Sequence, residues 1–171
     1  MICGVQIKHA MNTTTASPGQ VASLHLHPAE PGAALASVDV VELVPDKGIE
    51  GDTRYFGRVG KSPTEPFRRQ VSLIEREQIA EHAAGLGLKA IPPGAVRSNI
   101  ETTGINLVAL LGREVEIGEA RLFLYTPRDP CAKMDAICQG LRKRMMNSRQ
   151  GVMAQVRRGG KVRIGDSIRP V

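Results

Sequence analysis

The sequence predicts a β-rich, mixed α+β fold, barrel-like, in which short and mostly antiparallel strands are accompanied by about three helices. Three observations support this prediction. Hydrophobic residues make up 42% of the 171 residues, which is enough for a packed core. Short segments rich in β-branched residues recur along the chain and end at glycine or proline turns. Strands and helices do not alternate regularly, so a parallel βαβ sheet fits the pattern poorly.

Length and composition favour one domain preceded by a polar leader. Residues 1–20 include a run of small polar residues, so we expect a flexible leader there. The remaining segment, 21–171, contains no internal repeat and no linker long enough to separate two domains. We therefore predict a single domain over residues 21–171.

The first half of this domain is expected to contribute strands and one helix. Strands are predicted at three apolar segments: 21–26, 38–44 and 70–74. The second of them ends at Pro45 and a turn-rich segment. A helix is predicted over residues 75–86, because apolar residues recur there at helical spacing on one face.

The second half is expected to contain two helices and two hairpins. A short apolar helix is predicted over 107–111, with Gly112 as its C-cap, and a longer helix over 133–147. Strands are predicted at 114–118, 120–125, 151–157, 161–164 and 167–169. The turn at Gly118 predicts one hairpin, and the Gly159-Gly160 turn predicts a second between 151–157 and 161–164.

The positive charge is concentrated in the last third of the chain. The net charge is +6, from 23 Lys/Arg and 17 Asp/Glu, and residues 121–171 alone carry 12 Lys/Arg and three Asp. This asymmetry indicates an anionic partner: a phosphate-bearing small molecule, a nucleic acid or a membrane surface. Aromatic residues make up only 3% of the chain, which disfavours a nucleic-acid platform of stacked bases. No apolar run approaches the ~18–20 residues of a membrane span.

The cysteines point to a reducing compartment. The chain has three of them, Cys3, Cys131 and Cys138, which do not form a disulfide framework. The N-terminal residues lack the pattern of a secretory signal. We therefore expect a cytoplasmic protein with free thiols.

The segment with the strongest chemical signal is Thr126-Pro-Arg-Asp-Pro-Cys131, at the end of a predicted strand. Its two prolines restrict the backbone on both sides of Arg128, so Cys131 is expected at a rigid junction between a strand and a helix. The helix N–H groups and the cations Arg128 and Lys133 would favour a thiolate. Such a thiolate can act as a nucleophile, a sulfur carrier or a soft-metal ligand. A small buried core cysteine is the competing interpretation, and it is the one we expect for Cys138.

Other common sites are poorly supported by the sequence. There is no Cys-x-x-Cys pair, and His25 and His27 are expected to cap an exposed strand edge rather than to hold zinc. His82 is expected at the surface or half-buried on its helix. No nucleophile elbow is present, and Gly57-Arg-Val-Gly-Lys-Ser62 lacks the glycine spacing of a phosphate-binding loop.

An ordered set of short motifs resembles one known family. The motifs are Gly48-Ile-Glu-Gly-Asp52, Arg69-Gln-Val-Ser-Leu-Ile74, Pro93-Gly94 with Asn99, Gly104-Ile105, Leu111-Gly112, Ile117-Gly118, Pro127-Arg-Asp-Pro-Cys131, and Gly151 through Gly159-Gly-Lys-Val-Arg-Ile-Gly-Asp166. Over roughly residues 20–171 the chain resembles the MOSC domain, which is named after the C-terminal part of molybdenum cofactor sulfurase, and in particular its stand-alone bacterial members. It departs from the family pattern at Thr53 and Ser98, where a histidine and a glutamate are usual.

The resemblance implies a barrel-like fold and a molybdenum cofactor (molybdopterin) as the anionic small-molecule partner. Cys131 would be the functional thiol, either carrying sulfur or ligating molybdenum. Basic and polar residues would contact the pterin and its phosphate, for which the matching positions offer Arg69 and Arg128 as phosphate donors and Gln70 and Asn99 as readers of the pterin edge. Asp52 and Asp166 also fall in family motifs, and for both an Asx turn that closes the backbone is the alternative.

Three functions follow as hypotheses. The first is a cofactor-dependent reductase of N-hydroxylated compounds, served by an external electron donor. The second is a sulfur carrier or cofactor-delivery protein, in which a sulfur donor protein loads Cys131 with a persulfide. The third and least favoured is an anionic-surface or nucleic-acid binder that uses residues 142–144 and 157–158. Pyridoxal phosphate is associated with the family only through a separate desulfurase domain of the sulfurases.

Overall fold

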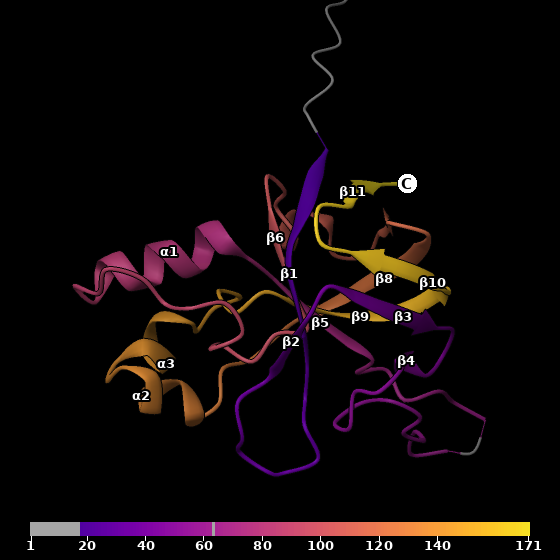
Figure 1. Ribbon diagram of the computed structural model, residues 1–171, viewed down its shortest axis with the longest axis horizontal. Helices are drawn as coiled ribbons and strands as arrows, with labels where there is room; N and C mark the ends of the chain where they lie inside the picture. Colours follow the sequence, from indigo (N-terminus) through magenta and orange to yellow (C-terminus); the bar gives the residue numbers. More distant parts are fainter. Residues whose placement is uncertain (1–17, 63) are drawn as a thin grey trace, which may run out of the picture.

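The centre of the fold is a closed barrel of seven strands (Figure 1). The computed structural model describes residues 18–62 and 64–171. The barrel strands are β1 (Gly19–Leu26), β5 (Val71–Glu75), β6 (Ile100–Thr103), β7 (Glu114–Ile117), β8 (Ala120–Pro127), β9 (Val152–Arg158) and β11 (Ser167–Pro170). Their order around the barrel is β11-β7-β8-β9-β5-β6-β1, and the pairing of β1 with β11 closes it. The predicted β-rich barrel is therefore confirmed.

The barrel is antiparallel except at one pair. β5 and β6 run parallel, and α1 (Arg76–Gly85) connects them as a crossover helix. β6 was not predicted from the sequence because its residues, Ile-Glu-Thr-Thr, are mostly polar. Its Glu101 is nevertheless fully buried, and its Oε2 accepts a hydrogen bond from the Arg76 guanidinium at 3.0 Å. This buried ion pair joins β6 to the start of α1.

A second, smaller sheet packs against the barrel and overturns one predicted hairpin. It consists of β10 (Gly160–Arg163), β3 (Val40–Val44) and β4 (Gly48–Ile49), while β2 (Ala36–Val38) extends the main sheet beside β1. The sequence predicted that β9 and β10 pair across the Gly159-Gly160 turn, and this is wrong: β10 pairs with β3. Both edges of β9 are already occupied by β5 and β8, so β10 must pair elsewhere.

The predicted helix over 133–147 is interrupted. It consists of α2 (Lys133–Ile137) and α3 (Leu141–Arg144), because Cys138 is extended and Gly140 has a φ of 91°. Asp135 stabilises the break, since its Oδ1 accepts hydrogen bonds from the N–H groups of Gly140 and Arg142, both at 3.0 Å. The predicted helix over 107–111 is a single 3-10 turn, η1 (Val108–Leu110). None of the helices in the described segments is long and apolar enough to cross a membrane.

The apolar residues form two cores. The larger fills the barrel, and the smaller lies between α1 and the α2–α3 segment, which sit on the same side of the barrel (Figure 1). The buried members of the smaller core are Ile74, Ile79, Ala83, Ile91, Val96, Met134, Leu141 and Met145. This second core positions the start of α2, which directly follows the Cys131 segment.

His82 lies inside the smaller core and not at the surface as expected. It is fully buried; its Nε2 lies 2.7 Å from the carbonyl oxygen of Arg149, and its Nδ1 has no partner within residues 18–62 and 64–171. Burial lowers the pKa of His82 below the ordinary histidine value. The unfolded chain therefore binds a proton more readily, so the stability from neutral His82 is complete above about pH 6.5 and is lost as the pH falls below it.

We expect His82→Gln to reduce this acid sensitivity. The free energy of unfolding of the wild type should fall between pH 7 and pH 5, and the fall should be smaller in the variant, at a cost of about 1 kcal/mol at pH 7. Urea denaturation at each pH measures both quantities. Part of the pH dependence of the unfolding free energy should remain in the variant, because burial also lowers the pKa of His25. If the unfolding free energy of the two proteins falls equally between pH 7 and pH 5, His82 does not contribute to the acid sensitivity.

Candidate functional site

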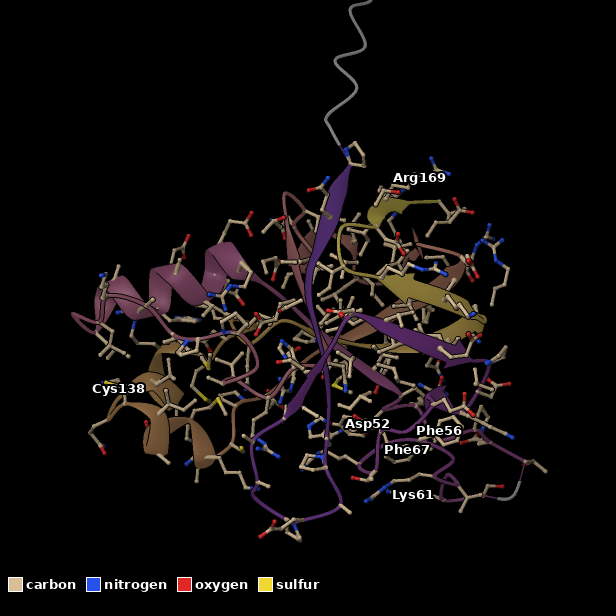
Figure 2. The ribbon with its side chains drawn as sticks, in the orientation of Figure 1. Asp52, Phe56, Lys61, Phe67, Cys138 and Arg169 are labelled. Atoms are coloured by element: carbon tan, nitrogen blue, oxygen red, sulfur yellow. The ribbon has the colours of Figure 1, made fainter. Side chains whose placement is uncertain are left out.

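Cys131 lies in the connection between β8 and α2, and its thiol is exposed to solvent. The N–H of Arg128 donates to the carbonyl oxygen of Gly151 at 2.9 Å, so the segment remains attached to the start of β9. The carbonyl oxygen of Cys131 accepts the N–H of Met134 at 3.1 Å and begins the first turn of α2. Of the two interpretations left open by the sequence, the structure supports an accessible thiol at a fixed junction. Cys138, labelled in Figure 2, is half-buried and directly follows the last residue of α2.

The Arg128 side chain supports a neighbouring loop. Its guanidinium donates to the carbonyl oxygens of Val96 and Arg97, at 3.3 and 2.9 Å. Burial lowers the pKa of Arg128. The negative charges that Tyr55 and Cys131 carry when ionised act in the opposite direction and raise it. An arginine remains charged at neutral pH despite such a shift. The Arg128 guanidinium is therefore a fixed cation three residues before Cys131 in the sequence.

Two further arginines affect Arg128. The positive charges of Arg54 and Arg97 contribute to the lowering of its pKa. The guanidinium of Arg54 also lies 5.5 Å from the centre of the buried Tyr55 ring, a cation–π arrangement. Neither Arg54 nor Tyr55 was identified from the sequence, although both lie within three residues of Asp52 in the Gly-Asp motif. Arg128 therefore has cationic neighbours from outside its own segment.

Arg69 lines a cavity of about 320 Å³ close to this region. Its other lining residues are Gly60, Lys61, Glu65, Pro66, Phe67, Arg68 and Tyr125. Burial raises the pKa of Tyr125, and the charges of Arg69 and Arg68 partly offset that rise. The negative charge of ionised Tyr55 acts to raise the pKa of both Tyr125 and Arg128. Of the predicted residues, Arg69 lines this cavity, and the cavity also includes Tyr125 of β8, the strand that Arg128 and Cys131 follow.

Asp52 and Asn99 form a buried polar network beside this site. Asp52 Oδ2 accepts three hydrogen bonds: from Asn99 Nδ2 at 2.7 Å, His27 Nδ1 at 2.8 Å and the His27 N–H at 3.0 Å. Its Oδ1 accepts the N–H groups of Arg54 and Tyr55, both at 3.0 Å, in an Asx turn. Burial alone would raise the pKa of Asp52, but the hydrogen bonds from His27 and Tyr55 outweigh it and lower the pKa.

The network extends through Asn99 to β5. Asn99 Oδ1 accepts from the Ser72 N–H and hydroxyl, at 3.1 and 2.8 Å, and its Nδ2 also donates to the carbonyl oxygen of His25. His25 and His27 are 1% and 3% exposed, so the expectation that they cap an exposed strand edge is wrong. In the described part of the chain, no three His, Cys, Asp or Glu side chains are arranged to hold a metal ion. Through Asp52 the network is connected to the 52–55 turn that carries Arg54 and Tyr55.

The remaining predicted residues occupy other places. Gln70 is 1% exposed; its Nε2 donates to the carbonyl oxygen of Phe67, and its Oε1 accepts the N–H of Val156, both at 2.8 Å. Asp166 Oδ2 accepts the Arg163 N–H at 2.7 Å, and the Asp166 N–H donates to the Arg163 carbonyl oxygen at 3.1 Å. Its side chain therefore closes the turn that precedes it, and not the Asx turn considered from the sequence. It lies against Gly118, next to the start of β8, whereas Cys131 follows the end of that strand. The structure therefore does not bring Asp166 and Cys131 together.

The two departures from the family pattern also lie near the network. The Thr53 hydroxyl donates to the carbonyl oxygens of His27 and Pro28, at 2.8 and 2.6 Å. Ser98 is fully buried, and its hydroxyl has no partner among the described residues. Thr53 thus reinforces the contact between its turn and the end of β1.

Three arginines of the basic segments 142–144 and 157–158, which the third hypothesis would use to bind an anionic surface, contact other residues of the protein. Arg157 lies over the Phe123 ring at 5.0 Å, and Arg158 pairs with Glu116 at 3.5 Å. The Arg144 guanidinium lies against Gly85 of α1 and donates to the Glu81 carbonyl oxygen at 3.4 Å. These contacts give the arginines structural roles.

The comparisons with known proteins identify the family. A family model described as the MOSC domain matches residues 25–169. The chain belongs to the MOSC domain family. Similar solved structures include the YuaD protein from Bacillus subtilis, which is 22% identical with a TM-score of 0.73, over 88% of this chain and 94% of that one. The YiiM protein from Geobacillus stearothermophilus is 18% identical with a TM-score of 0.68, over 90% and 75%.

A third similar structure is YiiM from Escherichia coli, with 21% identity and a TM-score of 0.63 over 89% of this chain and 69% of that one. At these identities the likeness concerns the fold, and this MOSC domain shares the barrel. No curated protein matches the chain at a significant level.

Proposed function

We propose that this MOSC domain binds the molybdenum cofactor through Cys131 and reduces N-hydroxylated compounds with electrons from an external donor. The observation that carries the proposal is the exposed Cys131, which follows by three residues an arginine, Arg128, whose guanidinium is fixed by two hydrogen bonds. A soft sulfur ligand among cations suits a metal centre whose organic part is anionic. A reducing cytoplasm, the compartment proposed here, would keep this thiol free.

The residues present include partners for both the metal and the phosphate of this cofactor. Cys131 would hold the metal, and Arg69, with Lys61 and Arg68 in the same cavity, would bind the phosphate. When bound, the cofactor would supply the two-electron chemistry. Arg128 orients the loop at Val96 and Arg97 and keeps positive charge next to the thiol.

The polar residues that the sequence analysis placed at the cofactor, Asp52, Gln70 and Asn99, have their side chains occupied by hydrogen bonds within the protein. We therefore propose that these residues position the surrounding segments. Exposed backbone groups of those segments would then meet the pterin. Asp166 takes no part in this proposal.

The exposure of Cys131 also suits the second hypothesis, a sulfur carrier or cofactor-delivery protein. A persulfide on an exposed thiol can be reached by a donor protein and by an acceptor without opening of the fold. Detection of a persulfide on Cys131 without metal, by intact-protein mass spectrometry, would favour this function over the reductase.

The reductase function is tested by activity. Protein from a molybdenum-replete host should reduce benzamidoxime with reduced methyl viologen as the electron donor. Cys131→Ala should lose at least about 100-fold in turnover, because it removes the metal ligand. Cys138→Ala is the matched control and should retain activity. A Cys131→Ala protein as active as the wild type would contradict the proposal.

A further inference from the structure

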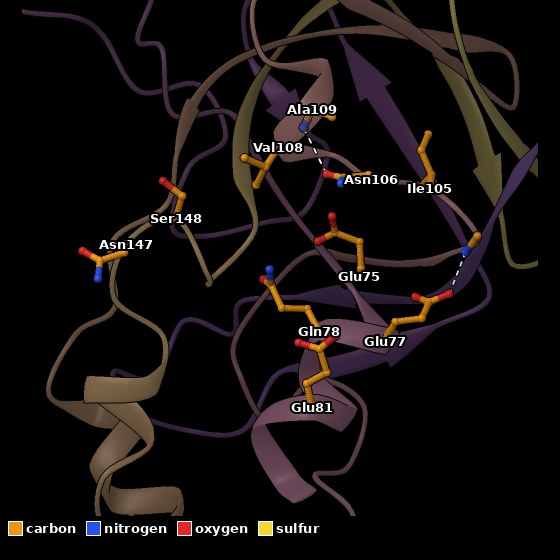
Figure 3. Close-up of a pocket in the computed structure, with 11 residues that line it drawn as sticks. Glu75, Glu77, Gln78, Glu81, Ile105, Asn106, Val108, Ala109, Asn147 and Ser148 are labelled. Carbon is orange, nitrogen blue, oxygen red and sulfur yellow. Dashed lines mark hydrogen bonds between the residues drawn. The ribbon is translucent and has the colours of Figure 1, made fainter. Parts of the chain in front are cut away.

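A second cleft, which Cys131 does not line, carries charge opposite to that of the whole protein. It has a volume of about 670 Å³ and lies between α1, η1 and the segment after α3 (Figure 3). Three carboxylates line it: Glu75, Glu77 and Glu81. The chain as a whole has a net charge of +6, so this acidic cleft is a local feature of the fold.

Glu75 is the unusual residue of this cleft. It ends β5 and is only 7% exposed. Its Oε1 accepts the N–H of Leu107 at 2.8 Å, but its Oε2 has no partner among the described residues. Figure 3 shows the carboxyl group directed into the cleft, toward Asn106. A buried acceptor without a donor is costly, which points to a donor supplied by a ligand.

The other two carboxylates already have partners in part. Glu77 Oε1 accepts the N–H of Gly104 at 2.7 Å, and Glu81 Oε2 pairs with Arg149 at 2.9 Å. They are four residues apart on α1 and therefore lie on one face of the helix, above the same opening. The negative charges of Glu77 and Glu81 attract a cation to the cleft. Glu75 Oε2 can then accept a hydrogen bond from that cation.

We propose that this cleft binds an aliphatic amine, whose ammonium group donates to Glu75 Oε2. An ammonium group brings three donors and a positive charge, which match an unpaired carboxylate oxygen. Ile105, Val108 and Ala109 line the same cleft and provide an apolar wall for the methylene groups. A metal ion fits less well, because no three carboxylate, histidine or cysteine side chains of residues 18–62 and 64–171 converge to hold one.

Titration calorimetry with putrescine tests this site. The wild type should bind putrescine at millimolar concentrations or below, and added salt should weaken the binding. Butanediol, which has the same chain length without charge, should not bind. Glu75→Gln should weaken putrescine binding about tenfold or more, because it removes the charge at the unpaired oxygen while the carbonyl oxygen can still accept from Leu107.

Two further variants complete the test. Glu30→Gln changes an exposed glutamate outside the cleft and should leave the affinity unchanged. Glu77→Gln, also at the surface, should weaken binding by a smaller factor and serves if Glu75→Gln does not fold, as judged by circular dichroism. The proposal is overturned if the wild type does not bind putrescine, if butanediol binds equally well, or if neither cleft variant lowers the affinity.

Discussion

Asp52→Asn is expected to lower the free energy of unfolding by about 3–5 kcal/mol. The carboxylate accepts five hydrogen bonds while only 1% exposed, from His27, Asn99 and two backbone N–H groups of its turn. An asparagine has one acceptor oxygen and one NH₂ group. Its NH₂ group would therefore replace one of the two carboxylate oxygens and would face N–H donors instead of accepting from them. The loss should therefore approach that of a broken buried ion pair.

Urea denaturation at pH 7 measures this loss. Asp39→Asn is a suitable control, because Asp39 is exposed and its change should cost no more than about 0.5 kcal/mol. Because the folded-state pKa of Asp52 is lowered, its stabilisation should be present above the ordinary aspartate pKa and be lost as the pH falls through the lowered value. If Asp52→Asn is as stable as Asp39→Asn, the network does not hold the turn.

Gly151→Ala is expected to prevent folding. Gly151 has a φ of 70°, and a Cβ atom there would overlap the carbonyl oxygen of Leu73 and lie 2.8 Å from the Cα of Ile74. Both contacts are with the backbone of β5, in the centre of the barrel, so neither can be relieved by a change of rotamer. Strain from the left-handed backbone adds to the clash.

Gly87→Ala separates these two contributions. Gly87 has nearly the same φ, 69°, but a Cβ there would meet nothing within 4 Å. This variant should fold and lose only about 1 kcal/mol, since it carries the backbone strain alone. Soluble yield and circular dichroism compare the two proteins. A folded Gly151→Ala protein of similar stability would show that β5 and β9 do not approach as closely as described.

The sequence predicted the local elements of the fold better than their pairing. The β7–β8 hairpin was correct because Gly118 and the alternation of apolar residues act within a few positions. The β9–β10 hairpin was wrong although its glycine signal was as strong, because β5 and β8, far away in sequence, already occupy both edges of β9. The break at Gly140 was missed for a similar reason: apolar spacing alone does not reveal the capping by Asp135.

The site was predictable where one short segment contains its chemistry. The prolines and charges around Cys131 indicated a restrained segment, and in the structure Arg128 is held by hydrogen bonds while Cys131 is exposed. Tyr55, Arg54 and Arg97 were missed, since the fold brings them to Arg128 from positions that lie far from it in sequence. Asp52 and Asn99 came from the family resemblance, and their direct hydrogen bond across 47 positions is a product of the barrel.

The molybdenum content of the purified protein tests the central claim, that Cys131 is the ligand of the cofactor. Wild-type protein from a molybdenum-replete host should contain about one molybdenum per chain by elemental analysis, and Cys138→Ala should match it. Cys131→Ala should contain almost none while remaining folded, because an exposed thiol contributes little to stability. Molybdenum at the wild-type level in Cys131→Ala, or its absence from the wild type, would contradict the account.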